Sequence, residues 1–154
     1  MAVRYEYAVD VGTSPEKAFA VIDDLPATAT WLPPCISLAK VGPGPNAVGD
    51  TLRYVFQQGG QRSEMEGEIL ERIPGQRLHC RYRDAAFDVT VDMRVAAVPG
   101  GTRTTHAIEI VPKTIVGRLL QPLIRLGLGK QTREAAANLK HLLERQEPDP
   151  CTPR

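Results

Sequence analysis

The 154 residues of the chain predict a single domain at about 150 residues per domain, and its hydrophobic (42%) and charged (24%) contents are those of an ordinary globular protein. Nineteen basic and eighteen acidic side chains leave a net charge of +1, so no overall basic surplus favours a nucleic acid or an anionic membrane as partner. A local basic patch is compatible with this balance.

Apolar and polar residues alternate over residues 3–11, which predicts a half-buried first strand. A short helix is expected next, running to about Asp23, because Thr13 and Glu16 fit a capping box ahead of it. One more helical turn is expected over residues 27–31, before two consecutive prolines end all helix.

The middle of the chain predicts an antiparallel meander, because alternating segments are separated by turns rich in glycine and proline. The expected strands lie near residues 35–41, 50–57, 62–72, 76–83, 86–97 and 102–112. Apolar residues occupy one face of these strands and charged residues the other, so the sheet should be covered on one side only. The glutamates within 64–68 and the arginines within 77–83 should form a solvated row of ion pairs.

The period of the apolar residues becomes helical from Thr114 to about Glu144. One stripe of this helix collects Leu120, Ile124, Leu128, Gln131, Ala135, Asn138, Leu139 and Leu142. A proline and two glycines over 122–129 weaken its first half, which predicts a kink or a separate leading turn. Residues 1–146 are therefore expected to form the domain and residues 147–154 a flexible tail.

This order of elements resembles the helix-grip fold of the START-like (SRPBCC) superfamily, also called the polyketide cyclase/dehydrase and lipid-transport group or the birch-pollen-allergen fold. The segments that carry the resemblance are 9–19 (VDVGTSPEKAF), 31–33 (WLP), 49–52 (GDTL), 74–78 (PGQRL), 119–123 (LLQPL) and 139–144 (LKHLLE). The resemblance implies an α+β fold with two short helices between the first two strands. A curved antiparallel sheet of about seven strands wraps around the long C-terminal helix and leaves a deep apolar cavity between them.

An apolar cavity of this kind is the default site for a small ligand. Strand alternation and helical spacing select the residues expected to line the cavity or its mouth and to bind the ligand. They are Trp31, Tyr54, Phe56, Met65, Tyr82, Phe87, Val89, His106, Ile108, Ile124, Leu128, Gln131 and Ala135.

Histidine and tyrosine are the candidate proton-transfer groups of this cavity. Alternation on the last strand makes His106 the histidine expected to reach the cavity. It can be an interior side chain that is hydrogen-bonded to a tyrosine or to water, or a group that contacts the ligand or takes part in catalysis. Tyr54 and Tyr82 should point inward with the same two roles open, and Tyr5 or Tyr7 can join them.

Two polar residues of the long helix, Gln131 and Asn138, lie seven residues apart and therefore on one face. Each can bond a ligand or satisfy a backbone group. The acidic residues of the strands all fall on the outward face, so no pair of carboxylates is expected inside and two-carboxylate chemistry is unsupported.

These observations favour a protein that binds a hydrophobic or aromatic small molecule, such as a lipid or a polyketide-like compound. One alternative is a polyketide cyclase/aromatase or dehydratase that uses His106 with Tyr82 or Tyr54 for proton transfer. Another is a protein–protein interaction module that binds through its sheet face, which a large exposed apolar patch would favour.

Other features limit the location and the chemistry. The chain has no apolar run of about 20 residues and no apolar segment at its N-terminus, so we expect a cytoplasmic protein without integral membrane association. Cys35, Cys80 and Cys151 are too scattered for disulfides or a zinc site. No phosphate-binding glycine loop occurs either. We therefore expect neither a cofactor nor a metal. No sequence pattern sets the oligomeric state.

Access to a buried apolar site requires an opening, and irregular segments are the weakest cover. Two such segments are residues 25–34 around Trp31 and residues 116–129 at the start of the long helix. We expect them to form a mobile gate over the ligand.

Overall fold

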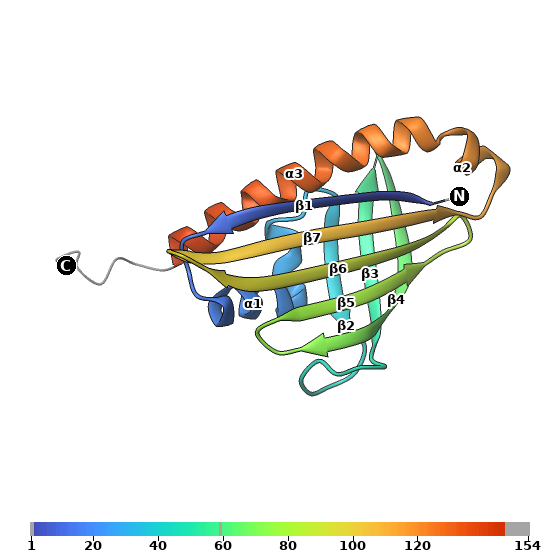
Figure 1. Ribbon diagram of the computed structural model, residues 1–154. Coiled ribbons are helices and arrows are strands. Elements are labelled where there is room, and N and C mark those ends of the chain that lie inside the picture. Colours follow the sequence, from blue (N-terminus) through green and yellow to red (C-terminus); the bar gives the residue numbers. More distant parts are fainter. Residues whose placement is uncertain (1, 59, 147–154) are drawn as a thin grey trace.

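The computed structural model describes residues 2–58 and 60–146, which form a curved, seven-stranded antiparallel sheet with a long helix across its concave side (Figure 1). The strands lie in the order β1-β7-β6-β5-β4-β3-β2. In chain order the elements are β1 (Val3–Val11), α1 (Pro15–Asp23), the 3-10 helix η1 (Leu25–Thr30), β2 (Cys35–Lys40), β3 (Thr51–Gln58), β4 (Gln61–Ile73), β5 (Arg77–Arg83), β6 (Phe87–Val98), β7 (Gly101–Pro112), α2 (Ile115–Leu119) and α3 (Gln121–Gln146). The fold predicted from the sequence is confirmed, while the tail expected over 147–154 and Cys151 within it lie outside the described residues.

Helix α1 begins at a cap other than the one predicted. Ser14 is its N-cap, and its hydroxyl oxygen accepts a hydrogen bond from the Lys17 N–H at 3.3 Å. Thr13 is buried instead, and its carbonyl accepts a hydrogen bond from Thr102 Oγ1 at 2.7 Å. The predicted capping box of Thr13 with Glu16 is therefore wrong, because β7 holds Thr13 ahead of the helix.

The C-terminal helical region consists of two helices, which confirms the predicted separate leading turn. Thr114 caps α2 by accepting a hydrogen bond from the Gly117 N–H at 3.0 Å, and Leu120 separates α2 from α3. Pro122 is the second residue of α3, where a helix does not need the missing N–H. Pro122 therefore starts α3 and does not weaken its interior, contrary to the interpretation from sequence.

The main core lies between the concave face of the sheet and the second half of α3, which runs along β1. Leu52, Ile69 and Leu78 are buried on the sheet, and Ala135 and Leu139 are buried on α3. Complete burial of a leucine or isoleucine side chain stabilises a fold by roughly 1.5–3 kcal/mol. This packing fixes the second half of α3 to the sheet.

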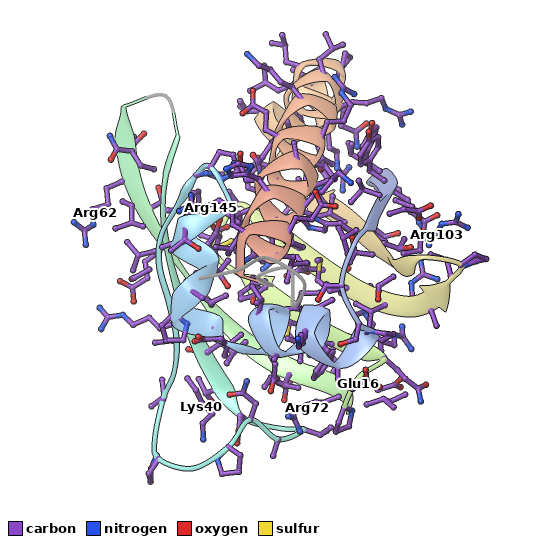
Figure 2. The ribbon with its side chains drawn as sticks, turned by 90° about the vertical axis from the view of Figure 1, so that its left-hand side faces the viewer. Glu16, Lys40, Arg62, Arg72, Arg103 and Arg145 are labelled. Carbon is purple, nitrogen blue, oxygen red and sulfur yellow. The ribbon has the colours of Figure 1, made fainter. Side chains whose placement is uncertain are left out.

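The convex face of the sheet carries charged side chains joined by ion pairs. Glu68 and Arg81, on neighbouring strands, lie 3.2 Å apart, which confirms one pair of the predicted row. Arg77 binds Glu71 and Asp92 instead, at 2.8 and 2.9 Å, since Glu71 of β4 and Asp92 of β6 lie within its reach. Figure 2 shows the sheet curving around the space beneath α3, with Arg62 and Arg103 projecting outward on opposite sides. Such a face does not favour a partner chain bound on the sheet.

A half-buried ion pair fixes α1 to the sheet. Two nitrogens of Arg72 donate to the two carboxylate oxygens of Asp23 at 2.9 and 2.7 Å, and Asn46 Nδ2 donates to Asp23 Oδ1 at 2.9 Å. Burial disfavours the charged form of Asp23, but the hydrogen bonds from Arg72 and Asn46 outweigh it and lower the pKa of the carboxyl. The network positions the end of α1, from which η1 continues over the sheet.

We predict that Asp23→Asn lowers the free energy of unfolding by about 1–2 kcal/mol at pH 7, since hydrogen bonds to a charged group are lost from a half-buried site. Because the pKa of Asp23 is lowered in the folded state, its contribution is complete at neutral pH and disappears as the pH falls through the folded pKa. Urea unfolding across pH tests both statements. Glu64→Gln, in the exposed bidentate pair with Arg53, is the control and should barely move the midpoint. Equal effects of the two variants would contradict the prediction.

Candidate functional site

A cavity of about 610 Å³ lies between the concave face of the sheet, η1 and the first half of α3. Its inner end is closed by Ile22 of α1 and Leu25 of η1, both of which are buried. Its wall reaches solvent near the start of α3, where Leu120, Leu123 and Gln61 line the cavity and are exposed. The cavity therefore has a closed end beneath α1 and a mouth beside α2 and α3.

The structure brings together nearly all the residues that the sequence selected for this cavity. The predicted residues on its wall are Trp31, Tyr54, Phe56, Met65, Tyr82, Phe87, Val89, His106, Ile108, Ile124, Leu128 and Gln131. Ala135 is not on the wall, because α3 is already packed into the core there.

Two other predicted groups lie outside the cavity. Tyr5 and Tyr7 are half-buried on β1 but are not part of the wall. Because β1 lies directly under α3, the Tyr5 ring packs near Gly129, and its hydroxyl oxygen accepts a hydrogen bond from Arg133 Nη1 at 3.0 Å. Asn138 donates to the Trp31 carbonyl at 3.1 Å, so its amide satisfies a backbone group.

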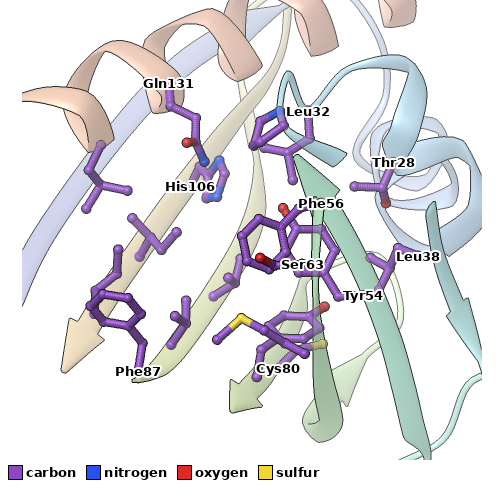
Figure 3. A pocket seen from close by; sticks show the side chains of 18 of the residues that line it. Thr28, Leu32, Leu38, Tyr54, Phe56, Ser63, Cys80, Phe87, His106 and Gln131 are labelled. Carbon is purple, nitrogen blue, oxygen red and sulfur yellow. The ribbon is translucent and has the colours of Figure 1, made fainter. Parts of the chain in front are cut away.

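One polar group of the wall is formed by Trp31, His106 and Gln131, which come from the end of η1, from β7 and from α3. The rings of Trp31 and His106 meet edge to face, with centroids 6.3 Å apart and an interplanar angle of 80°. Gln131 points from α3 toward His106 in Figure 3. The Trp31 indole Nε1 is buried and has no hydrogen-bond partner within the part of the chain that the structure describes. A buried donor without a partner is costly, so a ligand acceptor that reached Nε1 would gain a hydrogen bond that the protein alone lacks.

An aromatic wall on β3 and β5 forms the opposite side of the cavity. The Tyr54 and Phe56 rings stack with centroids 5.1 Å apart, and Tyr82 lies 5.4 Å from Tyr54 (Figure 3). Gly67 makes room for this arrangement, since a Cβ there would lie only 2.5 Å from Tyr82 Cδ1. A glycine on the apolar face of a strand was the available sequence signal for such a close approach, and the sequence interpretation missed it.

The histidine, tyrosine and cysteine side chains at His106, Tyr54, Tyr82 and Cys80 of the wall are uncharged near neutral pH. Burial lowers the pKa of His106 to about 4, so its imidazole is neutral. Burial also raises the pKa of the phenols of Tyr54 and Tyr82, and it raises the pKa of the Cys80 thiol to about 12. These groups can therefore exchange hydrogen bonds with a neutral ligand without carrying a charge.

Carboxylates contribute little to this site. Among the described residues Asp84 is the single acidic group of the wall, and its Oδ1 accepts hydrogen bonds from the backbone N–H groups of Ala86 and Phe87 at 2.8 and 2.7 Å. Asp84 thus shapes the turn between β5 and β6. Within residues 2–58 and 60–146, no group of three or more histidine, cysteine or acidic side chains could hold a metal ion.

The strand register separates His106 from the cavity tyrosines. His106 lies opposite Met93 of β6, and Met93 lies opposite Leu78 of β5, four residues before Tyr82. At about 3.4 Å per residue and about 4.8 Å per strand, the backbones at His106 and Tyr82 are about 14 Å apart along the strands and about 10 Å across them. The two side chains therefore face different parts of the cavity, which does not favour the alternative in which His106 and Tyr82 share one proton transfer.

Several wall residues were not selected from the sequence. They include Ile22, Leu25, Thr28, Leu38, Cys80, Val91, Met93 and Ile110. The strand residues Cys80, Val91 and Met93 follow the alternation that selected their neighbours, so the signal was present. Thr28 and Leu38 carried no such signal, because Thr28 lies in a 3-10 helix and the register of β2 shifts near Ser37.

Comparison with known proteins identifies the family. A family model described as polyketide cyclase/dehydrase and lipid transport matches residues 2–144, so the chain belongs to this family, as the sequence resemblance predicted. No curated protein matches the chain.

Solved structures share the fold at low sequence identity. The Zhui aromatase/cyclase from Streptomyces sp. R1128 is 11% identical, with 95% of this chain and 96% of that chain covered and a TM-score of 0.80. A START superfamily protein from Mycobacterium smegmatis is 15% identical, with 94% and 99% covered and a TM-score of 0.78. The protein TTHA0849 from Thermus thermophilus is 18% identical, with 96% and 100% covered and a TM-score of 0.77. Identities this low establish the shared fold only.

No helix of the described residues is both long and apolar enough to cross a bilayer.

We predict that His106 makes stability depend on pH. Its pKa is near 4 in the folded protein and near 6.5 when unfolded, so the unfolded state binds more protons between these values. Its contribution is therefore complete above pH 6.5 and is lost as the pH falls toward 4. Between pH 7 and 4 the wild type should lose about 3 kcal/mol more than His106→Gln. Urea unfolding measures this, and His79→Gln, altered on the outer face of the sheet, should keep the wild-type dependence. Parallel curves for wild type and His106→Gln would contradict it.

Proposed function

We propose that this protein binds a neutral, hydrophobic or aromatic small molecule in the cavity between the sheet and α3. The observation that carries the proposal is the cavity of about 610 Å³, whose wall is mainly apolar and aromatic, with a few polar side chains that include His106 and Gln131 beside Trp31. Pockets of roughly 300–1,000 Å³ with a few convergent polar groups are typical of small-molecule sites. Membership of the polyketide cyclase/dehydrase and lipid-transport family supports the same class of function.

The chemistry of the wall favours particular features in the ligand. A flat aromatic or polyene part suits the surface formed by Tyr54, Phe56 and Tyr82, since rings favour offset or edge contacts with other rings. A carbonyl or hydroxyl oxygen suits the Trp31 Nε1 donor. An anionic ligand is disfavoured, because His106 is neutral and no lysine or arginine lines the cavity among the described residues. A polyketide-like compound meets these features better than an anionic lipid does.

A ligand screen with a blocked variant tests this proposal. Neutral polyphenols, polyketide-like aromatics and neutral lipids are screened by thermal shift and by native mass spectrometry. Leu128→Trp places a large ring in the cavity wall and should abolish the thermal shift of any hit, whereas Leu126→Trp, on the exposed side of α3, should keep it. If no compound stabilises the wild type, or if Leu128→Trp binds as well as the wild type, the proposal is wrong.

A second candidate function is cyclisation of a poly-β-ketone. The specific observation that favours it is the neutral imidazole of His106 at the polar end of an otherwise apolar cavity. A neutral imidazole can remove a proton from a methylene group between two carbonyls. The resulting carbanion attacks a second carbonyl carbon of the same chain and closes the ring, and the alkoxide takes the proton back from the imidazolium. Loss of water then forms a carbon–carbon double bond in the ring. Such an intramolecular aldol condensation needs no oxidant and no reductant.

Turnover of a synthetic poly-β-ketone thioester, followed by chromatography and mass spectrometry, tests this second function. If His106 is the base, His106→Gln should lower the rate about 100-fold or more while still binding the cyclised product. His79→Gln, altered on the outer face of the sheet, should react at the wild-type rate. Products formed at the rate of the protein-free control would exclude the enzyme and leave the binding function.

A further inference from the structure

Exposed apolar side chains gather on α2 and the first half of α3. Their members are Ile115, Val116, Leu119, Leu123 and Leu126, and each is between 66% and 76% exposed. We call these five residues, together with Leu120, the apolar ridge. Clusters of large exposed apolar residues are uncommon on soluble domains and mark contact with another molecule or with a membrane.

The apolar ridge extends beyond the face of α3 that lines the cavity. Ile124 and Leu128 lie on the cavity wall, while Leu126 is off the wall and exposed, so the first half of α3 is apolar on two faces. A helix that is apolar all round is normally buried on all sides. Beyond Lys130 the outward positions of α3 become polar, with Arg133, Glu134 and His141 exposed. The outward apolar character is therefore confined to the part of α3 beside the cavity mouth.

Basic residues surround the apolar ridge, although the whole chain is nearly neutral. Residues 110–133 contain no aspartate or glutamate. They contain five basic residues, all exposed: Lys113, Arg118, Arg125, Lys130 and Arg133. Lys113 pairs with Asp88, whereas Arg118, Arg125 and Lys130 make no ion pair within the described part of the chain. This is the local basic patch that a net charge of +1 leaves possible.

We propose that the apolar ridge and its basic border dock on the surface of an anionic phospholipid bilayer. Exposed leucines with flanking arginine and lysine, and without acidic residues, form the pattern of an interfacial helix, whose apolar face enters the acyl boundary while its cations meet lipid phosphates. A second copy of the chain fits less well, because an isologous contact would bring two basic borders together.

The docking surface lies at the mouth of the cavity. Leu120 and Leu123 belong both to the apolar ridge and to the cavity wall. Docking would therefore bring the mouth to the lipid surface, so that an apolar ligand could enter from the bilayer without crossing water. This consequence rests on the proposed ligand-binding function, whereas docking itself depends on the ridge alone.

Vesicle co-sedimentation tests the docking. The full chain is mixed with vesicles of phosphatidylcholine alone, or of phosphatidylcholine with about 30% phosphatidylglycerol. We expect binding to the anionic vesicles only, and its loss at about 1 M salt. Changing Arg118, Arg125 and Lys130 to glutamine together should weaken binding on the order of 100-fold, at roughly fivefold per charge. Leu123→Ser with Leu126→Ser should weaken it at least about tenfold.

A matched control shows whether binding depends on the charges beside the apolar ridge or only on the total charge of the protein. Changing Arg62, Arg83 and Arg103 to glutamine removes the same charge from exposed positions on the sheet and should leave vesicle binding unchanged. Thermal melts check that each variant is folded. We expect all of them to fold, because the eight substituted side chains are exposed.

Several outcomes would overturn the proposal. These are the absence of binding to anionic vesicles, equal binding to both vesicle types, or equal losses for the α3 and control charge variants. Sedimentation that instead shows a dimer abolished by the double serine variant would assign the ridge to a second copy. The ligand screen is carried out without vesicles, so failure of docking leaves the proposed ligand binding standing, and failure of the screen leaves docking standing.

Discussion

One constraint governs this structure: a single helix must cover the apolar face of a seven-stranded sheet. A helix with its side chains is about 10 Å wide, whereas seven strands at about 4.8 Å spacing extend over about 29 Å. Curvature of the sheet reduces the mismatch but does not remove it. The second half of α3 packs directly on the sheet, and α1 with η1 closes one end. The remaining space beneath the first half of α3 is the cavity of about 610 Å³. The cavity is thus a geometric consequence of the fold, and its chemistry is set by the side chains that point into it.

Most of the fold could be predicted from the sequence because its elements obey strong local rules. Alternation defined the strands, glycine and proline defined the turns, and a helical period defined the last element. Errors arose where two local signals competed. Thr13 and Ser14 are both acceptable caps, and only the tertiary hydrogen bond from Thr102 decides between them. The partners of Arg77 are likewise invisible to alternation, because Glu71 of β4 and Asp92 of β6 both lie within its reach.

The cavity wall was predictable where it follows the alternation of side chains along the strands. For this reason Tyr54, Tyr82 and His106 lie on the wall, as expected. The sequence pattern does not reveal how closely α3 approaches the sheet. Ala135 was therefore assigned to the cavity, although α3 is packed into the core at that position. The Trp31 Nε1 donor, buried without a partner among the described residues, needed coordinates. The space that Gly67 leaves for the Tyr82 ring was signalled by a glycine on the apolar face of β4, but the sequence interpretation did not use that signal. Mobility of residues 25–34 and 116–129 as a gate stays a prediction. The exposure of the apolar ridge in the second segment makes its packing against the sheet weaker than that of the rest of α3.

A crystal structure of the protein with an aromatic ligand from the screen would test the central claim most directly. Our account predicts electron density for the ligand between α3 and the sheet, with its ring beside Tyr54 and Tyr82. It also predicts a ligand oxygen within hydrogen-bond distance of Trp31 Nε1. A structure in which side chains of α2 and α3 fill this space, or in which the ligand binds elsewhere on the molecule, would contradict the account.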